Sequence, residues 1–424
     1  MSSVLQRFLN IRKDELPATL ASAAFFFCVL TALMVLRPAR EALGMQRGLD
    51  AVRWLFIGTA VVTLAVNPVF GLLVSRMRRL AFITATYGFF AASLLVFWAL
   101  LTLAPQAIGE VSGMVFYVWF SVFNFFSTMV FWALMAERFT LEQSKRFFGV
   151  VAVGGTLGAI FGPWLAQLLA EPFGTASLLL VAVTFLLLAS GAAWLVTRLQ
   201  SAPAGDTPRA EPPPVIGGSP WAGFRAALTS PYLLAISGYV LILAVVVTFI
   251  YFTRLAMVAE VGSDLDARTT VFAQIDLATQ VATLLLQLIV TGHLMRRLGV
   301  PVTLALLPIV VAVGFAGLLA VGTLTALVIF DAVFRAVQRA IMRPARETLF
   351  TVVSIEDKYK AKAFIDTFVY RAGDVTGAWT EGLLGRFGLG LAALTSLAIP
   401  LAAVWMALGI WLGREQGRRA SAGR

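Results

Sequence analysis

The sequence predicts an all-α integral membrane protein with twelve transmembrane helices arranged in two six-helix halves. Of its 424 residues, 59% are hydrophobic and only 13% are charged, whereas a soluble domain has roughly 25% charged residues. Twelve apolar segments are each long enough to cross a bilayer core, because a thickness of about 30 Å takes about 20 helical residues. A stretch rich in Pro, Gly and Ser divides these segments into two sets of six.

The predicted helices follow the runs of apolar residues. They span residues 18–37, 52–75, 80–103, 111–136, 147–170, 176–197, 230–256, 269–291, 300–320, 324–342, 361–385 and 388–412. Residues 201–220 have too little apolar surface to bury, which indicates a flexible linker. We therefore predict an N-terminal bundle at 1–200, a cytoplasmic linker at 201–220 and a C-terminal bundle at 221–424.

Lysines and arginines concentrate in alternate loops, as they do in the cytoplasmic loops of membrane proteins. The loops at 104–110, 171–175 and 321–323, on the predicted opposite side, contain neither residue. The net charge of +11 therefore indicates membrane orientation rather than binding to nucleic acid. We expect a multi-pass protein of a bacterial inner membrane, surrounded by the lipid bilayer, with both termini in the cytoplasm.

Few residues are suited to metal or covalent chemistry. Cys28 is the single cysteine and His293 the single histidine, which excludes an internal disulfide, a multi-cysteine metal site and a His-based catalytic triad. No GxxxxGK[ST] motif is present, so an ATP-hydrolysing pump is not expected. We predict no enzyme, no catalytic residue, no metal and no cofactor.

The sequence Arg-Pro-Ala-Arg-Glu occurs twice, at 37–41 and 343–347, each time after an apolar segment. A charged side chain at membrane depth costs at least a few kcal/mol, so it normally faces a cavity. Pro38 and Pro344 mark either a break where backbone groups face a ligand or simply the end of a helix; the sequence leaves both interpretations open. The two motifs predict a polar path that attracts anions.

Helix 324–342 and the residues that follow it carry charged side chains four positions apart. These are Asp331, Arg335, Arg339, Arg343 and Glu347, with Arg346 beside them. On a helix they form one stripe about 24 Å long. A ladder of ion pairs between residues four apart is one interpretation. The surplus of positive charge favours the other, a stripe that lines a cavity.

Other charged residues extend the set of candidates. Lys362, Asp366 and Arg371 lie on helix 361–385, Asp276 on helix 269–291, and Glu137 just after helix 111–136. We predict substrate contacts from Arg37, Arg40, Arg335, Arg339, Arg343, Arg346, Lys362 and Arg371. For coupling or gating we predict Glu41, Glu137, Asp276, Asp331, Glu347 and Asp366.

Three segments together resemble the ATP/ADP antiporter (nucleotide transporter) family of plastids and intracellular bacteria, within or close to the major facilitator superfamily. They are FWALMAERFTLEQSKRF at 131–147, the Lys-Ala-Lys-Ala-Phe-Ile-Asp run at 360–366 followed by Arg371-Ala-Gly373, and Arg-Pro-Ala-Arg-Glu at 37–41. The resemblance implies a major-facilitator-like fold and nucleotide exchange. It makes Arg37, Arg40 and Lys362 candidates for phosphate contacts.

The chain departs from that family's pattern at Arg37, Ala361 and Asp374, where the family has lysine, glycine and a basic residue. A divergent branch with another anionic substrate would show such changes.

The expected mechanism is alternating access, in which the two six-helix halves rock against each other. We expect a monomer that carries a small anionic solute, most of all a nucleotide, because arginine binds phosphate through two parallel hydrogen bonds. Two alternatives stay open: a proton-coupled transporter of another anion, and a translocator of anionic lipid.

Overall fold

The computed structural model describes residues 15–76, 79–103, 105–139, 141–199, 230–262, 264–353, 361–362 and 364–422. These residues are helical apart from short turns, and they contain no strand. The chain divides into two compact units. Unit 1 comprises Met1–Thr207 and Val261–Leu277, and unit 2 comprises Pro208–Glu260 and Ala278–Arg424. The predicted linker at 201–220 lies outside the described residues.

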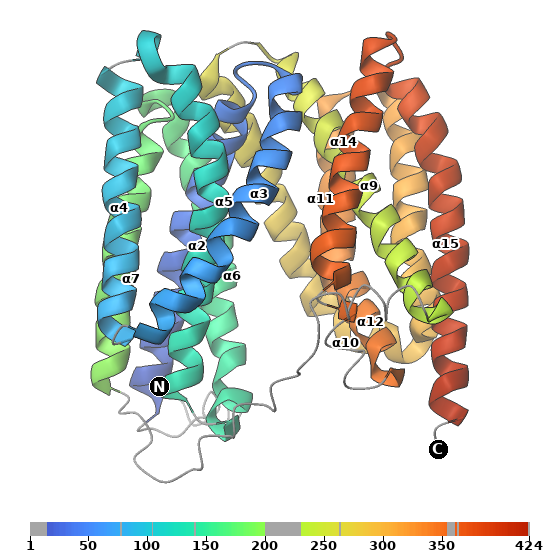
Figure 1. Cartoon of the computed structure of the whole chain (residues 1–424), viewed down its shortest axis with the longest axis horizontal. Helices are drawn as coiled ribbons and strands as arrows, with labels where there is room; N and C mark the ends of the chain where they lie inside the picture. Colours follow the sequence, from blue (N-terminus) through green and yellow to red (C-terminus); the bar gives the residue numbers. More distant parts are fainter. Residues whose placement is uncertain are drawn as a thin grey trace. The chain divides into compact units, whose positions relative to one another are not determined.

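Unit 1 is built around its first helix. Its helices are α2 (Leu16–Gly44), α3 (Leu49–Arg76), α4 (Arg79–Leu103), α5 (Pro105–Arg138), α6 (Leu141–Phe173) and α7 (Ser177–Leu199). Helix α2 packs against α5, α6 and α7, and α4 packs against α5 and α7 (Figure 1). Aromatic rings fill the core between α2 and α5, where Phe26 stacks on Phe131 with ring centroids 4.2 Å apart.

Glycines let α6 approach α2 closely. A Cβ atom on Gly154 would lie 2.3 Å from the carbonyl oxygen of Ala23, and one on Gly158 would lie 2.3 Å from that of Phe27. Small residues four apart allow the backbones of two membrane helices to touch. Gly154 and Gly158 therefore allow α6 to pack directly on the backbone of α2.

Unit 2 is built around α9. Its elements are α9 (Pro231–Ala259), α10 (Leu265–Val321, of which the residues up to Leu277 belong to unit 1), α11 (Leu324–Val337), η1 (Gln338–Met342), α12 (Arg343–Thr348), η2 (Leu349–Val352), η3 (Ile365–Val369), α14 (Tyr370–Arg386) and α15 (Leu391–Ala422). Helix α9 packs against α14 and α15 (Figure 1). Gly373 and Gly377 of α14 face α9 as the glycines of α6 face α2, since a Cβ on Gly377 would lie 2.9 Å from the Val245 carbonyl oxygen.

Most of the predicted helices appear within a few residues of their expected bounds. Within the described residues, nine helical stretches are long and apolar enough to cross a membrane. The predicted segments 269–291 and 300–320 form the single element α10, which turns at Gly299. The φ angle of Gly299 is 72°, a backbone conformation that residues other than glycine rarely adopt.

One boundary prediction is wrong. Helix α2 does not end at Arg37; it continues through Pro38 to Gly44, because one lost backbone hydrogen bond leaves its packing against α5, α6 and α7 intact. The predicted segment 324–342 has the expected bounds, but it is α-helical only to Val337 and continues to Met342 as the π-helical turn η1.

Candidate functional site

Two π-helical turns distinguish unit 2 from a regular bundle. In η1, the N–H of Arg343 donates to the carbonyl oxygen of Gln338, five residues earlier. In η3, the N–H of Tyr370 donates to Ile365 in the same way. Pro344 explains the first, because it has no N–H to bond the carbonyl of Ala340 and so disturbs the regular pattern. Such turns are rare and often occur at functional sites.

These wide turns change which side chains share a face. In a regular α-helix, residues five apart point about 140° away from each other. In a π-helical turn the hydrogen bond joins residues five apart, so these two residues are separated by about one full turn and lie on the same side of the helix. Gln338 and Arg343 therefore line one cavity together, and so do Asp366 and Arg371.

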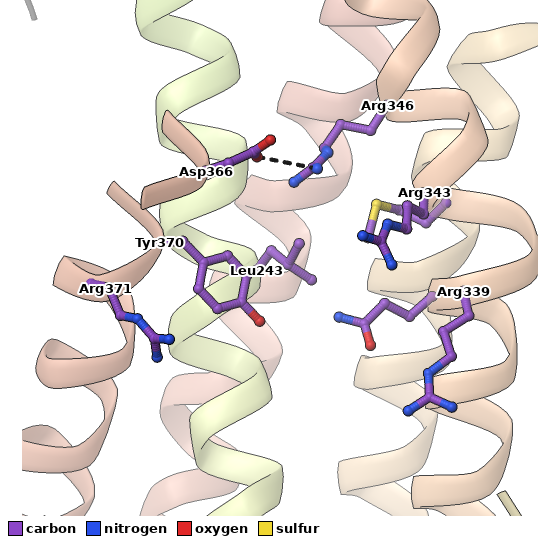
Figure 2. A pocket seen from close by; sticks show the side chains of 9 residues that line it. Leu243, Arg339, Arg343, Arg346, Asp366, Tyr370 and Arg371 are labelled. Carbon is purple, nitrogen blue, oxygen red and sulfur yellow. Dashed lines mark ion pairs between the residues drawn. The ribbon is translucent and has the colours of Figure 1, made fainter. Parts of the chain in front are cut away.

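That cavity lies within unit 2 and has a volume of about 420 Å³. Its lining residues are Leu243, Gln338, Arg339, Met342, Arg343, Arg346, Asp366, Tyr370 and Arg371. Figure 2 shows Arg339, Arg343 and Arg346 on one wall, with Asp366, Tyr370 and Arg371 on the facing wall. Among these described lining residues, four arginines against one aspartate leave an excess of three positive charges. The size is within the range of about 300–1,000 Å³ that small-molecule sites occupy.

Arg346 is the most deeply buried of these arginines, with 8% of its surface exposed. Its Nη2 atom lies 3.2 Å from Oδ1 of Asp366, the pair dashed in Figure 2, and 3.5 Å from Oε1 of Glu347. Glu347 also accepts a hydrogen bond from Nζ of Lys362. These contacts tie the end of α12 to η3 and to Lys362, which precedes η3 in the chain.

Glu347 lies beyond the predicted span 324–342. Burial alone would raise the pKa of its carboxyl, but the hydrogen bond and charge of Lys362 and the charge of Arg346 lower that pKa below its ordinary value of 4.5. The carboxylate is therefore ionised at neutral pH, and it contributes one negative charge beside Arg346.

The remaining cavity arginines differ in how they are held. Nη1 of Arg339 donates to Oε1 of Gln280 at 2.7 Å, and Nη1 of Arg371 lies 3.0 Å from Oδ2 of Asp374. Arg343 makes no hydrogen bond or ion pair within the described part of the chain, and its side chain is exposed to the cavity.

Arg335 and Asp331 were predicted as site residues, but neither lines this cavity. Asp331 is buried between two cations: Arg335, whose Nε lies 2.8 Å from Oδ1, and Arg254 of α9, whose Nη1 lies 3.5 Å from Oδ2. Asp331 and Arg335 form an ion pair four residues apart, as the alternative interpretation of the stripe expects, and their role in a polar path stays a prediction. The turn η1 follows Asp331 and Arg335 in the chain, and the cavity is lined by residues of η1 and by Arg343 and Arg346 after it.

Unit 1 brings together a second group of predicted residues. Nη1 of Arg37 lies 3.5 Å from Oδ1 of Asp276. Nη1 of Arg40 lies 2.7 Å from Oε1 of the buried Glu41, and its guanidinium lies 3.6 Å from the ring centroid of Tyr117. Glu137 is half-buried in the last turn of α5, away from the pairs just described.

Sequence reasoning did not select Gln338 and Tyr370, the two uncharged polar groups of the cavity. The proline at 344 is the signal that could have found Gln338, because a proline disturbs the turn before it. Among the residues that the structure describes, no group of three or more His, Cys, Asp or Glu side chains could hold a metal ion.

The model of the Major Facilitator Superfamily matches residues 17–338, more than half of the chain. The chain belongs to the Major Facilitator Superfamily. With the apolar helices described above, that membership makes it a multi-pass membrane transporter.

One relative by sequence and two solved structures are similar to this chain over most of its length. ADP,ATP carrier protein 2 of Chlamydia pneumoniae is 24% identical over 475 aligned positions, covering 94% of this chain and 87% of that protein. An auto-inhibited peptide transporter of the POT family superposes with a TM-score of 0.60 at 13% identity, covering 95% of this chain and 97% of its own. A bacterial homologue of ferroportin in its inward-facing state gives 0.59 at 12% identity, covering 97% and 100%. The two structures share the major-facilitator fold with this transporter.

Proposed function

We propose that this transporter exchanges nucleotides of the ATP and ADP type across the membrane by alternating access. The observation that carries the proposal is the cavity of unit 2, in which four arginines outnumber the single aspartate. Guanidinium groups bind phosphate oxygens through two parallel hydrogen bonds, and several such groups suit a chain of phosphates.

The roles of the individual arginines follow from how each is held. Arg343 has no partner within the described residues, so it is available to the incoming phosphate. Gln280 orients Arg339, and Asp374 orients Arg371. The guanidinium groups of both arginines are therefore held in place before the substrate binds. Tyr370 and Gln338 supply the uncharged polar groups that a nucleoside needs, and Tyr370 also offers a ring.

Two further observations support a nucleotide over other anions. The relative from Chlamydia pneumoniae is named as an ADP,ATP carrier, and the motifs at 37–41, 131–147 and 360–373 resemble those of nucleotide antiporters. With no nucleotide-hydrolysing motif in the sequence, the exchanged nucleotide itself supplies the driving gradient. We propose that the transporter acts as a monomer in a bacterial inner membrane, with both termini in the cytoplasm.

The test is uptake of labelled ATP into proteoliposomes that are preloaded with ADP or left empty. We expect uptake to require internal ADP. Arg343→Ala should lower the rate about tenfold or more, because a hydrogen bond to a charged group contributes about 1.5–3 kcal/mol. Arg418→Ala, which removes an exposed arginine at the far end of α15, is the matched control and should leave the rate unchanged.

Absence of uptake by correctly folded wild-type protein would exclude the nucleotide. Uptake that is driven by a proton gradient and does not depend on internal ADP would exclude exchange. A different phosphorylated or carboxylated anion that competes where ADP does not would move the function to that anion.

A further inference from the structure

Among the described residues that line the cationic cavity, Asp366 is the single acid. It lies in η3, and its side chain is about one third exposed (34%) while that of Arg346 is 10% exposed. An arginine as buried as Arg346 needs an anionic partner, since an uncompensated charge in a dry environment is strongly unfavourable. Without substrate, this anionic partner must be a carboxylate of the protein itself.

Within the described part of the chain, two carboxylates contact Arg346, and they are not equivalent. Glu347 is itself bound by Lys362 and lies at the longer distance, 3.5 Å against 3.2 Å for Asp366. Asp366 has no other ion-pair partner among the described residues. Asp366 can therefore leave Arg346 without breaking a second ion pair, while Glu347 cannot.

From this geometry we propose that Asp366 is an internal competing anion, which neutralises Arg346 in the empty cavity and is displaced by the substrate's phosphate. The proposal rests on the anion transport proposed above and adds a residue that sets the affinity. A phosphate that reaches Arg343, three positions before Arg346, carries its negative charge towards Asp366. Repulsion between the two anions then favours movement of Asp366 towards solvent.

The consequence is that Arg346 has a partner in both states. With the substrate absent it pairs with Asp366, and with the substrate bound it pairs with phosphate. Asp366 therefore lowers the affinity for every anion that reaches Arg346, because each must first replace it. Weaker binding favours release on the far side of the membrane, which a transporter requires.

The test is equilibrium binding of labelled ATP to the full-length protein in lipid nanodiscs, with unlabelled pyrophosphate as a competitor. Asp366→Asn removes the competing charge and should tighten ATP binding about two- to fivefold, a change typical of losing one partly exposed charge interaction. Asp366→Glu retains the charge and should bind ATP as the wild type does. Glu415→Gln, which removes the partner of Arg418 and Arg419 on α15, should also leave ATP binding unchanged.

Arg346→Ala provides the second arm. It should weaken ATP binding, and adding Asp366→Asn to it should bring no further gain, because the competing carboxylate then has no arginine to occupy. A purely structural role for Asp366 predicts the opposite of the main result, since damage to the fold weakens binding.

The outcomes separate this inference from the proposed function. Wild-type protein that binds neither ATP nor pyrophosphate would overturn both. Wild-type protein that binds ATP, with an Asp366→Asn variant that binds equally or more weakly, would overturn the role of Asp366 and leave nucleotide transport standing.

Discussion

At the scale of single residues, Asp331 shows what a buried charge does in this fold. Its side chain and that of Arg254 are each 1% exposed, and Asp331 also holds Arg335. One carboxylate thus neutralises charge on two helices, α9 and α11. Removing one partner of a buried ion pair leaves a charge without compensation and typically costs about 3–5 kcal/mol.

We therefore expect Asp331→Asn to lower the free energy of unfolding by about that amount, although the side chain keeps its shape. Thermal unfolding of the purified protein in detergent, followed by intrinsic fluorescence, measures the change. Arg418→Ala provides the control, because the Arg418 side chain is 78% exposed, and should unfold at the wild-type temperature. If the two variants unfold alike, Asp331 is not a structural bridge.

At the scale of elements, the two units use the same packing device. Glycines of α6 lie against α2 in unit 1, and Gly373 and Gly377 of α14 lie against α9 in unit 2. In each unit the first of its membrane helices is the one approached. This agrees with the internal repeat of transporters built from two related bundles, and it fixes α2 and α9 as the central helices.

Replacing a glycine with alanine, which adds one methyl group, tests this packing. Gly158→Ala places a Cβ 2.3 Å from the carbonyl oxygen of Phe27, so α2 and α6 must separate, at a cost of about 1–3 kcal/mol typical of overpacking. Gly149→Ala, on the same helix with open space around it, should be neutral or slightly stabilising. Thermal unfolding of both variants makes the comparison, and equal stability would contradict close packing at Gly158.

At the scale of the whole molecule, the alternation of basic loops predicts the orientation. Cys28 is the single cysteine, so Cys28→Ala gives a background without cysteine. On that background, Ser421→Cys marks the C-terminal end of α15, and Phe173→Cys marks the exposed end of α6.

A thiol reagent that cannot cross the membrane should label the Phe173→Cys variant in intact cells. It should label the Ser421→Cys variant only in inverted vesicles, because the loops rich in lysine and arginine stay in the cytoplasm. Labelling of both variants from the same side would refute the predicted topology. Labelling in the reverse order would place the termini outside.

The sequence by itself determined the class of protein and most of its helices. Apolar runs of about 20 residues require membrane spans, and this property is local, so it can be read without a structure. The surplus of arginine around the second Arg-Pro-Ala-Arg-Glu motif also pointed to the helices that line the cavity, because a charge beside an apolar run needs a polar environment.

Only the tertiary structure decided which of those side chains act together. The prediction of one stripe from Asp331 to Glu347 assumes a regular α-helix with 3.6 residues per turn. Residues Gln338–Met342 form a wider π-helical turn instead. The pairing of Arg346 with Asp366 joins residues from separate helices. A contact between distant segments depends on how the helices pack, so it cannot be predicted from a local pattern of residues.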